Sequence, residues 1–164
     1  MHHPHHLIIE HLQPSAITTD TVVLIAEHPE AIGIANVKQV AVEHVFCCGD
    51  TVDILFERND GTDIVVEIET IDPEPGCHQA IKYRALRCAE RGIPLDSKQI
   101  KAYLVAWEIP EAVSSFCNRY SIVHKKFRLD VGEMIRYWKA ITTIKNRQLN
   151  IFSLSQKKIS GSAV

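Results

Sequence analysis

The stretch that decides the fold is DTVDILFERNDGTDIVVEIE, residues 50–69. It contains two apolar runs, residues 52–57 and 64–69, on either side of a central Asn59-Asp60-Gly61. Short runs rich in Val and Ile favour strands, and a few residues with Asn, Asp and Gly between them favour a hairpin. We therefore expect two antiparallel strands joined by a three-residue loop, with Gly61 in the left-handed conformation.

The length of this loop fixes which side chains face each other. A three-residue loop pairs Arg58 with Thr62, and the same register then places Asp53 opposite Glu67. Because side chains alternate between the two faces of a strand, Glu69 shares a face with Glu67. Directly opposed residues have β-carbons about 5 Å apart. The sequence thus predicts a cluster of three carboxylates, although a loop one residue longer or shorter would move Asp53 to the other face.

Three like charges on one face of a sheet repel each other unless a cation lies among them. Carboxylate oxygens are suitable ligands for Mg²⁺, or for Mn²⁺, which one or two carboxylates hold together with water and a substrate phosphate. Such an ion can polarise a phosphoryl oxygen and activate an attacking water. The alternative is a solvated sheet face, on which Glu67 and Glu69 are ordinary surface residues.

The rest of the chain alternates between helix and strand patterns. Thr18, Thr19 and Asp20 are candidate N-caps before an apolar run, and Pro29 interrupts the helix that follows. Gly92 is the expected C-cap of a helix after the Pro-rich loop. The other expected elements are strands over residues 37–47, 101–107 and 120–129, and helices over residues 77–91, 110–118 and 131–147.

A chain of 164 residues is long enough for one domain with a substantial core. The order of elements predicts an α/β domain, in which a mixed central sheet is flanked by helices. We expect three parts. These are a His-rich N-terminal extension over residues 1–16, a core over residues 17–129, and a C-terminal helix with a basic tail over residues 130–164.

Composition excludes several classes of protein. No run of 18 apolar residues suggests a membrane span, and the N-terminus lacks the pattern of a secretory signal. The five cysteines are odd in number and form no CxxC pair, which argues against a disulfide scaffold and against a zinc knuckle. We therefore expect reduced thiols and a cytoplasmic protein that does not associate with membranes.

The charge is unevenly distributed along the chain. Residues 1–118 carry 8 Lys/Arg and 18 Asp/Glu, a net charge of −10, whereas residues 119–164 carry 10 Lys/Arg and 2 Asp/Glu, a net charge of +8. A basic segment beside an acidic body suits contact with a polyanion. Internal charge balance or a subunit interface would also account for the pattern. The candidate nucleic-acid contacts are Arg136, Lys139, Lys145 and Arg147.

The same residues carry a family resemblance. An Asp that opens an apolar strand, a turn, and a strand ending in an acidic motif resemble the core of the PD-(D/E)xK, or restriction-endonuclease-like, nuclease superfamily. Within it the chain most resembles the C-terminal nuclease domain of the NucS/EndoMS mismatch endonucleases, over roughly residues 20–128. The further matching segments are Glu27-His28-Pro29-Glu30, Gln79 with Tyr83 as a Q-x-x-x-Y motif, and Lys101-Ala102-Tyr103-Leu104-Val105-Ala106.

The resemblance implies a role for particular residues. Asp53 and Glu67 would hold the metal ion, and Gln79 would line the same site from the following helix. Asp20 falls where the family has an acidic residue on its first helix, so it is a candidate fourth ligand, with a simple N-cap as the alternative. The implied activity is hydrolysis of DNA phosphodiester bonds with Mg²⁺ or Mn²⁺.

One departure from the family pattern concerns catalysis. The motif lysine, which would stabilise developing negative charge, is replaced here by Glu69. Glu69 would then act as a general base or as a further metal ligand. Lys82, three residues after Gln79 on the same helix, is a candidate source of the missing positive charge, with a solvated surface lysine as the alternative. A degenerate module that only binds DNA is the competing interpretation.

A second departure concerns size. The mismatch endonucleases carry a separate N-terminal domain for dimerisation and DNA binding, whereas this chain has room for the nuclease core and a C-terminal segment. Mismatch specificity is therefore not implied. DNA is the expected partner, a homodimer stays an open alternative, and a protein-interaction subunit without nucleic acid is a third interpretation.

Overall fold

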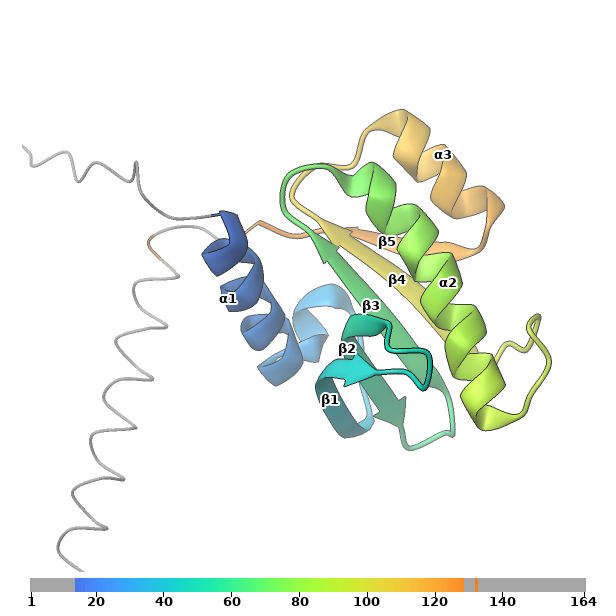
Figure 1. Cartoon of the computed structure of the whole chain (residues 1–164). Coiled ribbons are helices and arrows are strands. Elements are labelled where there is room, and N and C mark those ends of the chain that lie inside the picture. Colours follow the sequence, from blue (N-terminus) through green and yellow to red (C-terminus); the bar gives the residue numbers. More distant parts are fainter. Residues whose placement is uncertain (1–13, 129–131, 133–164) are drawn as a thin grey trace, which may run out of the picture. The chain divides into compact units, whose positions relative to one another are not determined.

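The computed structural model describes residues 14–128 and Gly132 (Figure 1). The chain divides into two units, Met1–Arg128 and Leu129–Val164, and the sheet belongs to the first of them. The helix expected over residues 131–147 lies almost wholly outside the described residues. So do its four candidate DNA contacts, Arg136, Lys139, Lys145 and Arg147.

The described unit is an α/β fold built on one mixed five-stranded sheet, as the sequence predicts. The strands lie in the order β1-β2-β3-β4-β5. The first three strands pair antiparallel, and β4 and β5 continue the sheet parallel to β3. The elements are α1 (Pro14–Glu27), the 3-10 helix η1 (Pro29–Ile32), β1 (Val37–Val45), β2 (Thr51–Arg58), β3 (Asp63–Glu69), α2 (Pro73–Arg91), β4 (Ile100–Ala106), α3 (Glu111–Arg119) and β5 (Ile122–Lys126).

Each face of the sheet has its own apolar core, because strand side chains alternate between faces. On one face, Val22 and Ile25 of α1 pack with strand residues that include Ile54 and Val66. On the other face, Leu55 and Val65 pack with residues of α2 and α3. Figure 1 shows α2 lying along the sheet beside α3, with α1 standing apart from both. Glu67 and Glu69 have the parity of Val65, so they belong to the face that α2 covers.

Helix α2 is longer than the sequence pattern suggests, since it begins at Pro73 rather than near residue 77. The side chain of Asp72 caps it by accepting a hydrogen bond from the Glu74 backbone N–H at 3.1 Å, and proline fits the first helical position. Gly92, with φ 62°, ends the helix as predicted. The early start brings the first turn of α2 directly after the acidic end of β3.

The expected start of α1 is wrong. The helix begins at Pro14, so Asp20 lies inside it and is not its N-cap. Proline suits a first turn, and the threonines that follow are tolerated inside a helix that packs on a core. Strand β5 is shorter than expected and ends at Lys126. In the part of the chain that the structure describes, no helix has the length and apolar character to cross a membrane.

Candidate functional site

The hairpin between β2 and β3 has the predicted loop and register. The backbone N–H of Arg58 donates to the Thr62 carbonyl at 2.9 Å, and Gly61 has φ 80°. Cα pairing runs from Glu57↔Asp63 to Ile54↔Val66. One more step in this register places Asp53 opposite Glu67, on the face covered by α2. The local turn chemistry therefore brings two acidic residues, 14 positions apart in the chain, to one place.

Glu67 is a buried carboxyl group with one oxygen that has no partner. Only 6% of the residue is exposed, and its Oε2 is buried with no hydrogen-bond partner. Burial raises the pKa of Glu67 to about 9, and the negative charges of Asp53 and Glu69 add to this rise. The interpretation of Glu67 as a solvated surface residue is therefore wrong.

Asp53 is held in place by the backbone of the neighbouring strand. Its Oδ2 accepts a hydrogen bond from the Ile68 N–H at 2.7 Å, beyond the last paired residues of the β2–β3 ladder. Burial raises the pKa of Asp53, this hydrogen bond lowers it, and the negative charge of Glu43 raises it. The bond leaves the other carboxylate oxygen, Oδ1, without a hydrogen-bond partner among the described residues.

Glu69, at the end of β3, is half-buried under the first turn of α2. Burial raises the pKa of Glu69, and the charges of Asp53 and Asp72 raise it further. Gly76 of α2 lies directly against it. A β-carbon on Gly76 would come within 2.6 Å of Glu69 Cγ and 2.7 Å of Leu104 Cδ1. The absence of a side chain at Gly76 is therefore what allows α2 to cover Glu69 at this distance.

Gln79 and Tyr83 explain the spacing of the Q-x-x-x-Y motif. Residues four apart lie on one face of a helix, and the Tyr83 hydroxyl donates to Gln79 Oε1 at 3.3 Å. Tyr83 is buried and its ring stacks on Phe46, 5.7 Å between centroids. Gln79 is half-buried, and its one recorded hydrogen bond is the bond to Tyr83. The structure thus shows the pair linked within α2, and the role of Gln79 at the site stays a prediction.

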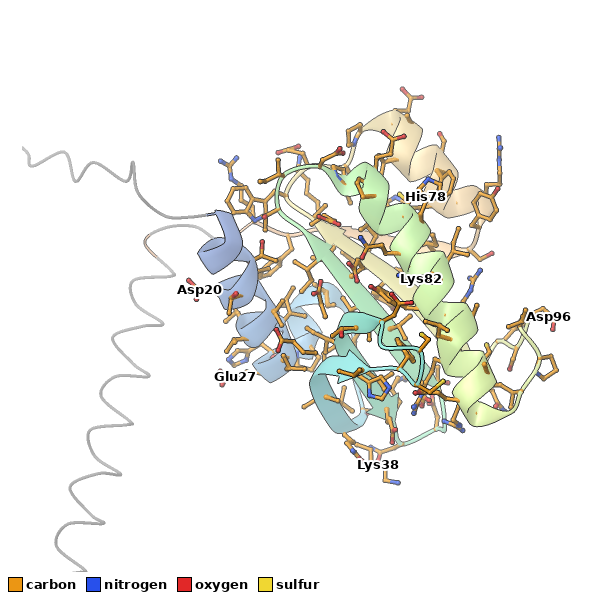
Figure 2. The ribbon with its side chains drawn as sticks, in the orientation of Figure 1. Asp20, Glu27, Lys38, His78, Lys82 and Asp96 are labelled. Atoms are coloured by element: carbon orange, nitrogen blue, oxygen red, sulfur yellow. The ribbon has the colours of Figure 1, made fainter. Side chains whose placement is uncertain are left out.

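Lys82 is a cation that acts on Glu67 within the carboxyl cluster. Its positive charge lowers the pKa of Glu67, against the larger effect of burial. The Nζ atom itself pairs with Asp50 at 2.9 Å and lies 4.7 Å from the centre of the Tyr83 ring. Figure 2 shows Lys82 on α2, over the sheet. It is therefore near the site, but its ammonium group is bound to Asp50.

Asp20 is not brought to the site. In Figure 2 it lies on the outer side of α1, pointing away from α2 and Lys82. Across the described residues, no group of three or more His, Cys, Asp or Glu side chains is arranged to hold a metal ion. The three carboxyl groups of Asp53, Glu67 and Glu69 act on each other electrostatically, but they are not arranged as a three-ligand group.

Two contributors were missed by sequence reasoning. Asp50 pairs with Lys82, which lies 32 positions away in the chain, and no local sequence pattern predicts this contact. Gly76 does leave a signal, because a glycine within a helix costs about 1 kcal/mol relative to alanine and so indicates a close approach. Both residues shape the surroundings of the carboxyl cluster without belonging to the acidic motif.

The donor set fits a hard divalent cation held by two carboxylates. Mg²⁺ commonly takes only one or two protein carboxylates and completes its shell with water and phosphate oxygens. Glu67 supplies a buried oxygen that no protein group satisfies, and Asp53 supplies a second carboxylate fixed by the Ile68 N–H. A cation between them would remove the repulsion that raises the pKa of Glu67.

No protein-family profile and no curated protein matches the chain. Among solved structures, it is similar to a repair endonuclease from Pyrococcus abyssi, with 20% identity, a TM-score of 0.57, and coverage of 73% of this chain and 49% of the other. It is also similar to EndoMS in a complex with double-stranded DNA, with 19% identity, a TM-score of 0.57, and coverage of 73% and 48%.

The chain is also similar to EndoMS in its apo form, with 18% identity, a TM-score of 0.53, and coverage of 74% of this chain and 48% of the other. The chain spans about half the length of the structures that it matches. At these identities the likeness concerns the fold. The described unit has the α/β fold of the NucS/EndoMS repair endonucleases, as the sequence motifs predict.

Proposed function

We propose that the protein is a metal-dependent endonuclease that hydrolyses phosphodiester bonds of DNA. The observation that carries the proposal is the buried Oε2 of Glu67, which has no partner and lies on the strand facing Asp53. A buried carboxyl group that the protein leaves unsatisfied is a candidate functional group. Its place in a fold shared with structures of repair endonucleases, one of them bound to double-stranded DNA, supports DNA as the substrate.

Asp53 and Glu67 would hold Mg²⁺ or Mn²⁺ in this proposal. When bound, the ion would polarise a phosphoryl oxygen and lower the pKa of an attacking water. The Ile68 N–H fixes the orientation of Asp53, and the first turn of α2 limits the access of water on that side. The proposal leaves Asp20 out of the ligand set, because it points away from α2.

Glu69 would take the proton of the attacking water. Its raised pKa brings the carboxylate closer to the range in which a general base works at neutral pH, and it is exposed enough to meet solvent. Lys82 would offset part of the negative charge that gathers on phosphate oxygens, once substrate competes with Asp50 for its ammonium group. Gln79 would act through Tyr83 by holding the helix surface next to the site.

The test is cleavage of duplex, single-stranded and branched DNA, with RNA as a further substrate, in Mg²⁺, Mn²⁺ or EDTA. Asp53→Asn, Glu67→Gln and Glu69→Ala should each lower the rate at least about 100-fold, as expected when charge stabilisation or a general base is removed. Glu111→Gln, an exposed acid on α3, serves as the matched control and should cut at the wild-type rate.

Calorimetry separates metal binding from cleavage. Wild type should bind Mn²⁺, and Asp53→Asn should bind it more weakly; equal binding by both proteins would reject the site. A wild type that binds DNA but cuts none of these substrates would favour the second candidate, a degenerate DNA-binding module. Two observations favour that candidate. Glu69 stands where the motif has lysine, and the described acidic residues include no three-ligand group.

A further inference from the structure

A second feature lies at the other end of the sheet. A hollow of about 630 Å³ opens between the second half of α2, the loop that follows it, the starts of β4 and β5, and the turn after α3. Its charged lining residues are Arg84, Lys98, Lys101, Arg119 and Asp96. Figure 2 shows Asp96 at the tip of the loop between α2 and β4, away from Lys82.

The lining is strongly basic, with four cationic side chains and one acid. Elsewhere on the described surface, Lys82 and Lys126 are paired with carboxylates, whereas Lys38, like the cations of the hollow, forms no ion pair with a described residue. Lys98, Lys101 and Arg119 form no ion pair with any described residue. Asp96 offsets only part of the charge of the four cations, so the hollow keeps a net positive charge and attracts an anion.

Arg84 is positioned to serve as a fixed donor in this hollow. Its Nη1 donates to the Tyr120 carbonyl at 2.9 Å and to the Ser121 carbonyl at 3.4 Å. Ser121 adopts φ 54°, a left-handed conformation uncommon for a serine, in the turn that presents these carbonyls. The Nε and Nη2 groups have no recorded hydrogen-bond partner among the described residues. A guanidinium held on one side offers its remaining N–H groups to a phosphate.

The hollow lies at a defined level relative to the carboxyl cluster. Ile100, on its wall, pairs with Asp63 at the start of β3, whereas Glu67 pairs with Leu104. Four residues of strand separate these levels, which is about 13 Å at 3.3 Å per residue. Lys101 and Tyr103 pair with Ile64 and Val66, so they lie on the face opposite Glu67, and the hollow includes side chains from both faces of the sheet.

Apolar surface next to the cations favours a nucleic-acid strand over a small anion as the ligand. Leu95 and Tyr120 line the same hollow, with 65% and 42% of each residue exposed. Exposed aromatic and aliphatic groups beside cations are typical of surfaces that bind nucleic-acid strands, because bases stack on them while phosphates meet the charges. Inorganic phosphate would use the cations alone.

We infer that the hollow lined by Arg84, Lys98, Lys101 and Arg119 binds backbone phosphates of the nucleic-acid strand that the carboxyl site cleaves. This inference rests on the proposed function, since it concerns how the same strand is held. It assigns a contact to the described unit itself, in addition to the basic residues predicted in the C-terminal segment.

The test compares wild type with the triple variant Lys98→Gln, Lys101→Gln, Arg119→Gln, leaving Arg84 in place because it binds two backbone carbonyls. Binding of labelled single-stranded and duplex oligonucleotides is measured in EDTA over a series of salt concentrations. Each lost phosphate contact should reduce the salt slope by about 0.9 on duplex or about 0.7 on single strands. We expect affinity at low salt to fall about 10-fold or more, and the slope to fall by about 2.

Two controls show whether charge at this place is responsible. The variant Lys98→Arg, Lys101→Arg, Arg119→Lys keeps every charge and should retain most of the affinity. Lys38→Gln removes an exposed strand lysine at the opposite edge of the sheet, and should weaken binding less than Lys101→Gln. Circular dichroism and thermal unfolding of each variant verify that the fold is kept.

The outcomes are distinct. Equal affinity and equal slope in wild type and the triple variant would overturn the inference, as would a wild type that binds neither oligonucleotide. Binding of inorganic pyrophosphate is measured for the same proteins. Its loss in the triple variant with unchanged DNA binding would also overturn the inference, since the hollow would then take a small free anion. Reduced DNA binding by the triple variant, together with absence of cleavage in wild type, would support the hollow and reject the endonuclease.

Discussion

Strand β3 carries a buried carboxyl group near each end, and the protein treats the two in opposite ways. Asp63, at the start, is 1% exposed and accepts hydrogen bonds from Arg87 Nε at 2.8 Å and Arg91 Nη1 at 2.7 Å. Glu67, four residues later, is 6% exposed, and its Oε2 has no partner. Burial is thus similar at the two ends, and the difference lies in the cations that the fold supplies.

The paired end has the character of a structural network. Arg87 also donates to Glu57 at 2.7 Å and to Glu90 at 3.0 Å, so one guanidinium joins β2, β3 and α2. At the unpaired end, carboxyl groups of raised pKa lie close together, and the nearby Lys82 is paired with Asp50. A buried charge with its partners in place contributes to the fold, whereas one left without them is available for a ligand.

The largest expected effect is on the paired end. Arg87→Met should destabilise the protein by about 3–5 kcal/mol, because it leaves the buried Asp63 carboxylate with only Arg91. Urea unfolding at pH 7 measures this loss. The double variant Asp63→Asn, Arg87→Met should recover part of it, since no full charge then stays buried. A loss below about 1 kcal/mol for Arg87→Met would show that the network is not structural.

At the unpaired end, removal of a charge should stabilise the protein, whereas removal of the Arg87 charge destabilises it. The pKa of Glu67 rises from 4.5 to about 9 on folding, so the folded state binds the extra proton between these values. Stability is therefore highest below about pH 4.5 with respect to this group, and is lost as the pH rises toward 9. The slope is at most about 1.4 kcal/mol per pH unit. Glu67→Gln should remove this slope and stabilise the protein at pH 8, while it abolishes cleavage.

A divalent cation sharpens this test. Mn²⁺ at pH 8 should stabilise wild type, because it supplies the charge that Glu67 lacks, and should leave the melting temperature of Glu67→Gln almost unchanged. The exposed variant Glu111→Gln should keep the wild-type slope and the wild-type response to Mn²⁺. If Glu67→Gln were destabilising at pH 8, the hydrogen bond from the Asp53 backbone to the carboxyl group would outweigh the cost of burying the charge.

The hairpin and its acidic register could be predicted because they depend on nearby residues. Asn59-Asp60-Gly61 fixes the loop length, and the alternation of β3 then fixes which carboxyl groups share a face. Gly92 ends α2 for a similarly local reason. These are choices in which turn chemistry and apolar pattern agree, so tertiary packing does not override them.

The difference between the two ends of β3 could not be predicted, since it depends on contacts between distant residues. Arg87 meets Asp63 across 24 positions, and Lys82 meets Asp50 across 32. Both Lys82 and Arg87 are cations on one helix, and the sequence alone does not show which carboxyl group of β3 each of them contacts. The predicted start of α1 is wrong for another reason. Residues 18–20 have the pattern of a helix cap, but the helix continues through them, because local propensity is a weak signal that tertiary context can override.

A smaller effect is expected where α2 meets the end of β3. Gly76→Ala gains about 1 kcal/mol of helix propensity. Against this, its β-carbon would lie 2.6 Å from Glu69 Cγ and 2.7 Å from Leu104 Cδ1, and Leu104 is fully buried and cannot move aside. Overpacking typically costs about 1–3 kcal/mol, so we expect a net loss of about 1 kcal/mol. Thermal unfolding measures the sign.

The Gly76 variant also tests the carboxyl site, because Glu69 must shift to accommodate the new methyl group. Cleavage by Gly76→Ala should fall more than its stability does. Adding Glu69→Ala should relieve the clash with Glu69 but not the clash with Leu104, so stability should recover only in part. A more stable Gly76→Ala with unchanged cleavage would mean that α2 can move away from the strand without consequence.

The smallest effect on stability, and a large one on function, is expected at Lys82. Its ion pair with Asp50 is exposed on both sides, at 43% and 42%, and such pairs contribute little to folding. Lys82→Met and Asp50→Asn should therefore leave the urea midpoint unchanged. Because the Lys82 charge lowers the pKa of Glu67, its removal raises that pKa further and moves Mn²⁺ binding to higher pH.

The two variants separate a functional lysine from a surface one. Lys82→Met should lower the cleavage rate about 10-fold or more if this ammonium group replaces the charge of the missing motif lysine. Asp50→Asn frees the same ammonium group, so it should keep or increase the rate and move Mn²⁺ binding to lower pH, and Lys82→Arg should stay close to wild type. Equal cleavage and equal pH dependence of Mn²⁺ binding in all four proteins would assign Lys82 to the solvated surface. The negative charge at Glu69 would then have no cationic counterpart among the described residues near the site, which would favour the DNA-binding module over the nuclease.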